Sequence, residues 1–240
     1  MEDDDGGVAE VLAEWRFLGA ESRARLLELT YRLLVDIRWE TARGFTLTDE
    51  MPLTVAAHAA LLFLGMDAET PPHPRAVVLH PGTIVLRGER SGSVVGTRSD
   101  GPFHLSGQRS ENQPMLLSWR DIRAAVAEPG SGRNVVVHEF AHELDAADRL
   151  LDGTPPIADA EVRDRWIATC SEVYDRLHAG DRDPLIRSYA GTTPSEFFAV
   201  VCELFLSRPI ELAGAHPALY AVWTEALGQD PAARRHQPEG

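Results

Sequence analysis

The stretch Val135–Asp148, VVVHEFAHELDAAD, carries two histidines and four carboxylates within an otherwise apolar run. On an α-helix its apolar residues would cover nearly the whole circumference, which predicts a buried helix. Asn134 stands just before this stretch and can cap the helix. Buried histidines and carboxylates without partners cost free energy, so this helix must meet a group that holds charge.

The histidines follow the pattern HEFAH. His138 and His142 are four residues apart, so their side chains lie on one helical face and can bind one Zn²⁺ at ~2.0–2.1 Å from each nitrogen. Glu139 points to a neighbouring face, where it can hydrogen-bond a water but is poorly placed to bind the metal. Such a pattern also arises by chance on solvated helices, but the apolar surroundings favour a zinc site with Glu139 as general base.

A third metal ligand is required, because a catalytic zinc usually has three protein ligands and a water. The best candidate segment is Tyr189–Leu206, YAGTTPSEFFAVVCELFL, in which Glu196 and Glu203 are seven residues apart on one helical face. Glu196 could instead complete a capping box that begins at Thr193. Glu203 could instead hold a histidine N–H or lie on the helix surface. Spacing alone leaves these alternatives open.

The remaining sequence predicts an α+β protein. β-Branched runs indicate strands within Ala76–Arg87 and Pro114–Trp119. Apolar periodicity predicts helices at 20–40, 54–64, 121–126, 159–178, 194–206 and 216–227. Because no linker forces a boundary, we expect one compact domain over residues 8–230, with a helical N-terminal part. Residues 1–7 are expected to be a disordered acidic tail and residues 231–240 a frayed one.

Composition limits the partners and the compartment. The formal net charge is −14, which disfavours binding to nucleic acid and to anionic membranes. No apolar run approaches the ~20 residues needed to span a bilayer, and the N-terminus has no signal pattern. Cys170 and Cys202 lie in apolar helical patterns without a disulfide framework. These features predict a cytoplasmic protein.

Two segments resemble the Mlc titration factor A family of zinc metallopeptidases. They are HEFAHELD followed by DGTPP, and YA–TTPSEFFAVVCELFL; PMLLSWRDIR, upstream, is also similar to that family. The likeness covers roughly Ala76 to Trp223, and only generic helices precede residue 70. The resemblance implies a zincin-like fold that is mostly helical, with a small mixed β-sheet over the metal-binding helix.

The resemblance also implies roles for individual residues. One Zn²⁺ per chain would be bound by His138, His142 and Glu196, with Glu139 as the base. A family tyrosine seven residues before the third ligand maps onto Tyr189, whose phenol could donate a hydrogen bond to an oxyanion.

Several candidate residues keep a structural alternative. Tyr189 could instead pack its ring on the core. Asp145 could orient a ligand imidazole or bond the backbone near the helix end. His58, in an apolar helix, is more simply a hydrogen-bonded core residue than a ligand.

Three functions remain open from the sequence. The first is a zinc peptidase, aminopeptidase-like, acting on peptides or small proteins. The second, implied by the family's name, is a regulatory factor that binds and sequesters a sugar-responsive transcriptional repressor. The third is a metal-dependent hydrolase of another bond. Since a pure binding protein does not need a general base, the presence of Glu139 favours an enzyme.

Overall fold

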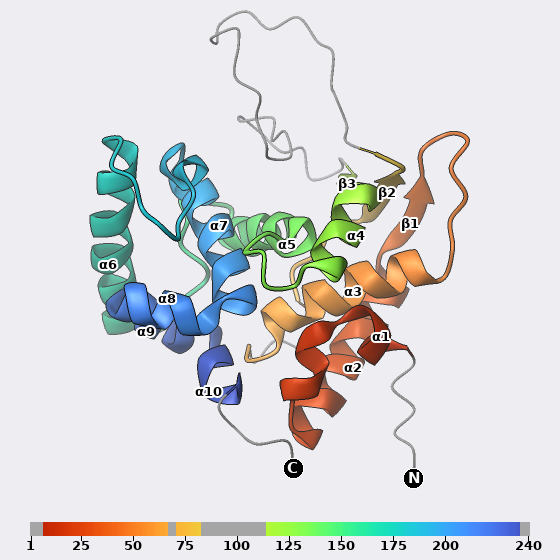
Figure 1. Ribbon diagram of the computed structural model, residues 1–240, viewed down its shortest axis with the longest axis horizontal. Coiled ribbons are helices and arrows are strands. Elements are labelled where there is room, and N and C mark those ends of the chain that lie inside the picture. The colour runs from red at the N-terminus through yellow and green to blue at the C-terminus, as the bar shows by residue number, and fades with distance from the viewer. Residues whose placement is uncertain (1–6, 67–70, 83–113, 236–240) are drawn as a thin grey trace, which may run out of the picture.

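The structure, a computed structural model, describes residues 7–66, 71–82 and 114–235. These ranges are mostly helical, with a small parallel sheet in the strand order β1-β2-β3 (Figure 1). The strands are β1 (Arg38–Thr41), β2 (Ala76–His80) and β3 (Met115–Ser118). The α+β class is therefore confirmed.

The expectation of a mixed sheet was wrong, because both described strand pairings are parallel. Helix α3 (Glu50–Phe63) lies between β1 and β2 in the chain, and such a crossover lets consecutive strands run in the same direction. Residues 83–87 of the predicted strand material lie outside the described residues.

The helices occur where periodicity predicted them, with short additional ones between them. The α-helices besides α3 are α1 (Val8–Val11), α2 (Ala20–Asp36), α4 (Trp119–Ala127), α5 (Val135–Asp145), α6 (Ala160–His178), α7 (Pro194–Ser207), α8 (Pro209–Ala215), α9 (Pro217–Leu227) and α10 (Pro231–Arg235). Short 3₁₀ helices are η1 (Ala13–Phe17), η2 (Ala146–Asp148) and η3 (Ser188–Gly191). None of the helices in the described ranges is long and apolar enough to cross a membrane.

Two predicted boundaries were wrong. The helix expected over 20–40 ends at Asp36, and β1 follows at Arg38–Thr41, paired with β2. Apolar spacing missed this change because strand pairing is a long-range contact. The frayed tail expected at 231–240 begins with α10, whose Arg235 donates hydrogen bonds to the carbonyls of Leu206 and Ser207. Residues 236–240, like the first six of the expected acidic tail, lie outside the described residues.

Helices α5 and α7 form the centre of the molecule and lie against each other (Figure 1). Helix α5 also contacts α3, α4 and β3. Every residue of α7 from Glu196 to Ser207 is buried, as expected for a helix that is apolar on all sides. An aromatic cluster packs α7 against α6 and α9. The ring centroids of Trp166 of α6 and Trp223 of α9 are 4.0 Å apart, and Phe198 of α7 packs against both.

Both central helices have well-defined starts. The Asn134 side chain accepts hydrogen bonds from the backbone N–H groups of Val136 and Val137, which confirms the predicted cap of α5. Thr193 accepts from the backbone N–H of Glu196 and Pro194 occupies the first turn, so α7 is capped in the same way. The caps fix where His138 and Glu196 lie along their helices.

Candidate metal centre

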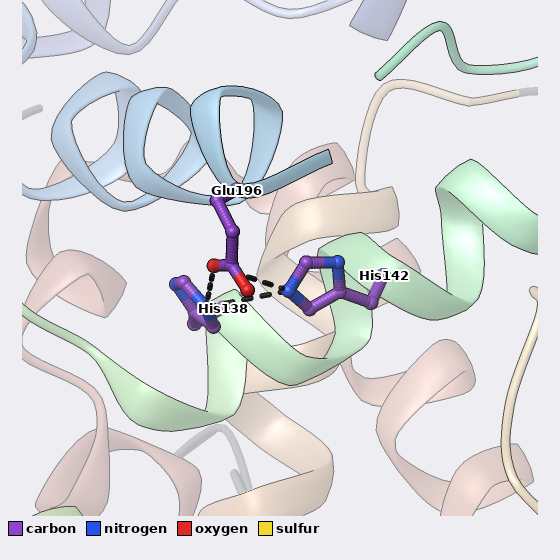
Figure 2. Close-up of side chains that lie close together, drawn as sticks. All are labelled: His138, His142 and Glu196. Carbon is purple, nitrogen blue, oxygen red and sulfur yellow. Dashed lines mark hydrogen bonds and ion pairs between the residues drawn. The ribbon is translucent and has the colours of Figure 1, made fainter. Parts of the chain in front are cut away.

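Three side chains from α5 and α7 converge on one point. Figure 2 shows Glu196 pointing from α7 toward His138 and His142 on α5. The Nε2 atoms of the two histidines are 3.3 Å apart. One Glu196 carboxylate oxygen, Oε2, lies 3.0 Å from Nε2 of His138 and 3.7 Å from Nε2 of His142. All three side chains are buried.

These separations fit a single metal ion. Ligand atoms at ~2.0–2.1 Å from a tetrahedral zinc would lie about 3.3 Å from one another. The observed distances scatter around that value, and the three residues form a candidate metal-binding group among the described residues. The set of two imidazoles and one carboxylate is chemically suited to a divalent transition metal.

The outer nitrogen of His138 is held by Glu203. Its Nδ1 donates to Glu203 Oε1 over 2.8 Å, and Arg187 donates to the same oxygen. The other oxygen of Glu203 accepts from the backbone N–H of Asn134 over 2.6 Å. Glu203 is therefore not a member of the convergent group; its carboxylate fixes the tautomer and the ring orientation of His138.

The outer nitrogen of His142 is held differently. Its Nδ1 lies 2.8 Å from the Ser195 hydroxyl. Burial raises the pKa of the neighbouring Asp145 to about 6, although its interaction with Ser195 opposes that rise. Asp145 additionally accepts from the backbone N–H of Gly153. The backbone alternative for Asp145 is therefore confirmed, and the group in direct contact with His142 is Ser195.

Gly153 permits a close approach between the turn that follows α5 and the start of α7. Its φ is +80°, a left-handed conformation that favours glycine, and an added Cβ would lie 2.4 Å from the carbonyl oxygen of Pro194. The turn after α5 is thereby packed directly on the start of α7, next to Ser195.

The electrostatics of the group favour a bound cation. Burial alone would lower the pKa of His138, but its bonds to Glu196 and Glu203 outweigh burial and raise the pKa to about 10. For Glu196 and Glu203, burial acts in the other direction and would raise the pKa. Contacts with the histidines outweigh burial and hold the pKa of both carboxyl groups low. Without a metal, a proton supplies the positive charge, and a metal ion would displace it.

Glu139 and Tyr189 border the same group. Glu139 is 3% exposed, and its charge acts on both His138 and Tyr189. Tyr189, in η3, has its ring centroid 6.2 Å from that of His138. Burial, followed by the charge of Glu196 and a hydrogen bond to it, raises the pKa of the phenol, so the hydroxyl stays protonated.

The sequence located the converging residues but not all of their supports. Thr193 accepts from the backbone N–H of Glu196, which is one half of the predicted capping box, but the Glu196 carboxylate faces the histidines and not the N-cap. Ser195 and Arg187 were missed. Ser195 is adjacent to the predicted ligand, and Arg187 is an arginine in a polar loop, so neither carries a spacing signal.

The sequence model of the glucose-regulated metallo-peptidase M90 family matches residues 8–226. The chain belongs to this family. The match confirms the predicted relationship and corrects its extent, because the family begins at Val8 and not near residue 76. The helices before residue 70 are thus part of the M90 fold.

Relatives agree with this extent. Mlc titration factor A of Serratia proteamaculans is 30% identical over 94% of this chain and 90% of its own length. Mlc titration factor A of Yersinia pestis is also 30% identical, over 94% of this chain and 88% of its own. An uncharacterized protein of Synechocystis is 29% identical over 85% of this chain and 76% of its own.

We expect the purified protein to bind one divalent metal ion per chain and Glu196→Gln to weaken that binding more than Glu203→Gln. Glu196→Gln would remove a carboxylate that faces both imidazoles, whereas Glu203 contacts the three converging side chains only at Nδ1 of His138. Metal analysis after dialysis against a weak chelator measures both effects. An unchanged metal content in the His138→Ala/His142→Ala double variant would exclude this site.

Proposed function

We propose that this M90 family member is a zinc-dependent peptidase with a zincin-like arrangement around α5. The observation that supports this most strongly is the convergence of His138, His142 and Glu196 beside a buried Glu139. Two histidines and a glutamate are a ligand set used for catalytic zinc, which leaves a fourth position open. When bound there, zinc would supply Lewis acidity to the scissile carbonyl and to the attacking water.

Glu139 is the proposed general base. Its carboxylate accepts a proton from the attacking water and then delivers that proton to the leaving amine nitrogen. Two features support this role: its burial, which limits competing solvation, and its place directly after His138, which turns it away from the ligand face. A binding protein would not need a base at this position.

Tyr189 is the proposed oxyanion donor. Its hydroxyl hydrogen-bonds Glu196 and is kept protonated, so it can donate to the negative oxygen that develops on the scissile carbonyl. Arg187 has its guanidinium carbon 6.0 Å from the Tyr189 ring centroid and bonds Glu203, which connects the oxyanion donor to the support of His138.

The proposed substrates are peptides or small proteins, cleaved in an aminopeptidase-like manner in the cytoplasm. Membership of the metallo-peptidase M90 family supports peptide bonds as the substrate, while the aminopeptidase-like manner and the cytoplasmic location remain predictions from the sequence. The same residues could hydrolyse a different bond, because a metal, a base and an oxyanion donor do not dictate amide chemistry.

A second candidate function is regulatory binding. Relatives from Serratia proteamaculans and Yersinia pestis are named Mlc titration factor A, and the likeness extends over 94% of this chain. On this basis the chain would bind a transcriptional regulator, with hydrolysis weak or secondary. The net charge of −14 would suit a partner with a basic surface.

Glu139→Gln should keep the fold and the zinc but lose peptide hydrolysis by ~10²–10⁴-fold, because the amide is nearly isosteric and cannot accept the proton. Steady-state kinetics on amino-acid anilides and short peptides, with zinc content measured in each sample, test this. Full, chelator-sensitive activity in Glu139→Gln would refute the mechanism. A zinc-loaded parent that cleaves no peptide would favour the regulatory function.

Tyr189→Phe should lower turnover by at most ~10²–10³-fold, because a single oxyanion donor is lost. The effect should fall on kcat more than on KM, since the hydrogen bond forms mainly in the transition state. An increase in KM with unchanged kcat would instead assign Tyr189 to substrate binding.

A further inference from the structure

We infer that His58 is a positioning residue for His138. It acts through Asn134 and Glu203 on Nδ1 of the His138 ring, whereas Glu196 faces Nε2. The inference rests on the proposed function, because it concerns how firmly His138 is held for the metal. A chain of hydrogen bonds connects the Val11 carbonyl, at the end of α1, with the imidazole of His138.

Both ring nitrogens of His58 have partners. His58 lies on α3 and is 4% exposed. Its Nε2 is 3.1 Å from the Val11 carbonyl oxygen, and its Nδ1 is 2.7 Å from Nδ2 of Asn134. His58 thus bridges the N-terminal segment and the start of the metal helix, and is more than a core-filling side chain.

The direction of these bonds follows from the Asn134 side chain. Its Oδ1 accepts from the N–H groups of Val136 and Val137, so its Nδ2 is the end that faces His58. An amide nitrogen only donates, and Nδ1 of His58 must therefore accept. Nε2 then carries the proton and donates to Val11. Burial lowers the pKa of His58 to about 4, which agrees with a neutral ring.

The next two links lead to the metal ligand. The backbone N–H of Asn134 donates to Oε2 of Glu203, and Oε1 of Glu203 accepts from Nδ1 of His138. Because Nδ1 of His138 holds the proton in this tautomer, its Nε2 can present a lone pair to a metal. The position of Asn134 therefore influences the angle at which Glu203 holds the ligand.

Two substitutions separate the halves of the His58 bridge. In His58→Asn the side-chain amide ends where Nδ1 ends, so its oxygen can still accept from Asn134, while the bond to Val11 is lost. In His58→Gln the amide extends to the place of Nε2, so it can still donate to Val11, while the bond to Asn134 is lost. Both variants lose the ring and some packing.

The experiment measures the zinc dissociation constant by competition with a chromophoric chelator, and the Tm of the metal-free protein, in the full chain. Both variants should lower the metal-free Tm. His58→Gln should weaken zinc binding about tenfold, at the low end of outer-shell effects, whereas His58→Asn should stay close to the parent. Leu62→Val, one turn further along α3, is the control: it should lower Tm without changing zinc affinity.

The outcomes are distinct. Equal zinc affinity in His58→Asn and His58→Gln, whether unchanged or equally weakened, would overturn the positioning role while leaving the metal site intact. Weaker binding in Leu62→Val, to the same extent as in His58→Gln, would likewise overturn it, because loss of stability would then explain the effect. A parent protein that binds no zinc would overturn the proposed function itself, and the positioning role with it.

Discussion

The buried carboxylate of Glu203 is the contact on which the arrangement of the site depends. A carboxylate that is 2% exposed requires compensation, and Glu203 obtains it from His138, Arg187 and the Asn134 backbone. These partners come from α5, from the residue before η3 and from the N-cap of α5, while Glu203 itself is on α7. One side chain therefore joins the ligand helix, the second central helix and the segment that carries Tyr189.

The two candidate ligand histidines are supported by separate groups, so the orientation of each ring is fixed independently. His138 is held by a carboxylate, whereas His142 is held by the Ser195 hydroxyl. Both supports bond Nδ1, so both Nε2 atoms are directed at Glu196. Ser195 and Glu196 are consecutive in α7. The same helical turn therefore provides the converging carboxylate of Glu196 and, through Ser195, the support for the imidazole of His142.

The sequence predicted what depends on local periodicity. The apolar run around HEFAH, the cap at Asn134 and the polar positions of α7 are all properties of single helices. Strand β1, the buried start of α10 and the parallel strand order depend on contacts between distant segments. The same limit applied at the site. His58 was recognised as a core histidine, but its connection to His138 passes through Asn134 and Glu203, which come 76 and 145 positions later in the chain. Family resemblance, not spacing, favoured Glu196 over Glu203 as the converging residue.

The most direct test of the account is a crystal structure of the zinc-loaded protein with anomalous data collected on both sides of the zinc absorption edge. We predict one anomalous peak per chain, within ~2.0–2.1 Å of Nε2 of His138, Nε2 of His142 and a carboxylate oxygen of Glu196, with Glu203 still bonded to Nδ1 of His138. A zinc peak on Glu203, or one that avoids both histidines, would contradict the account.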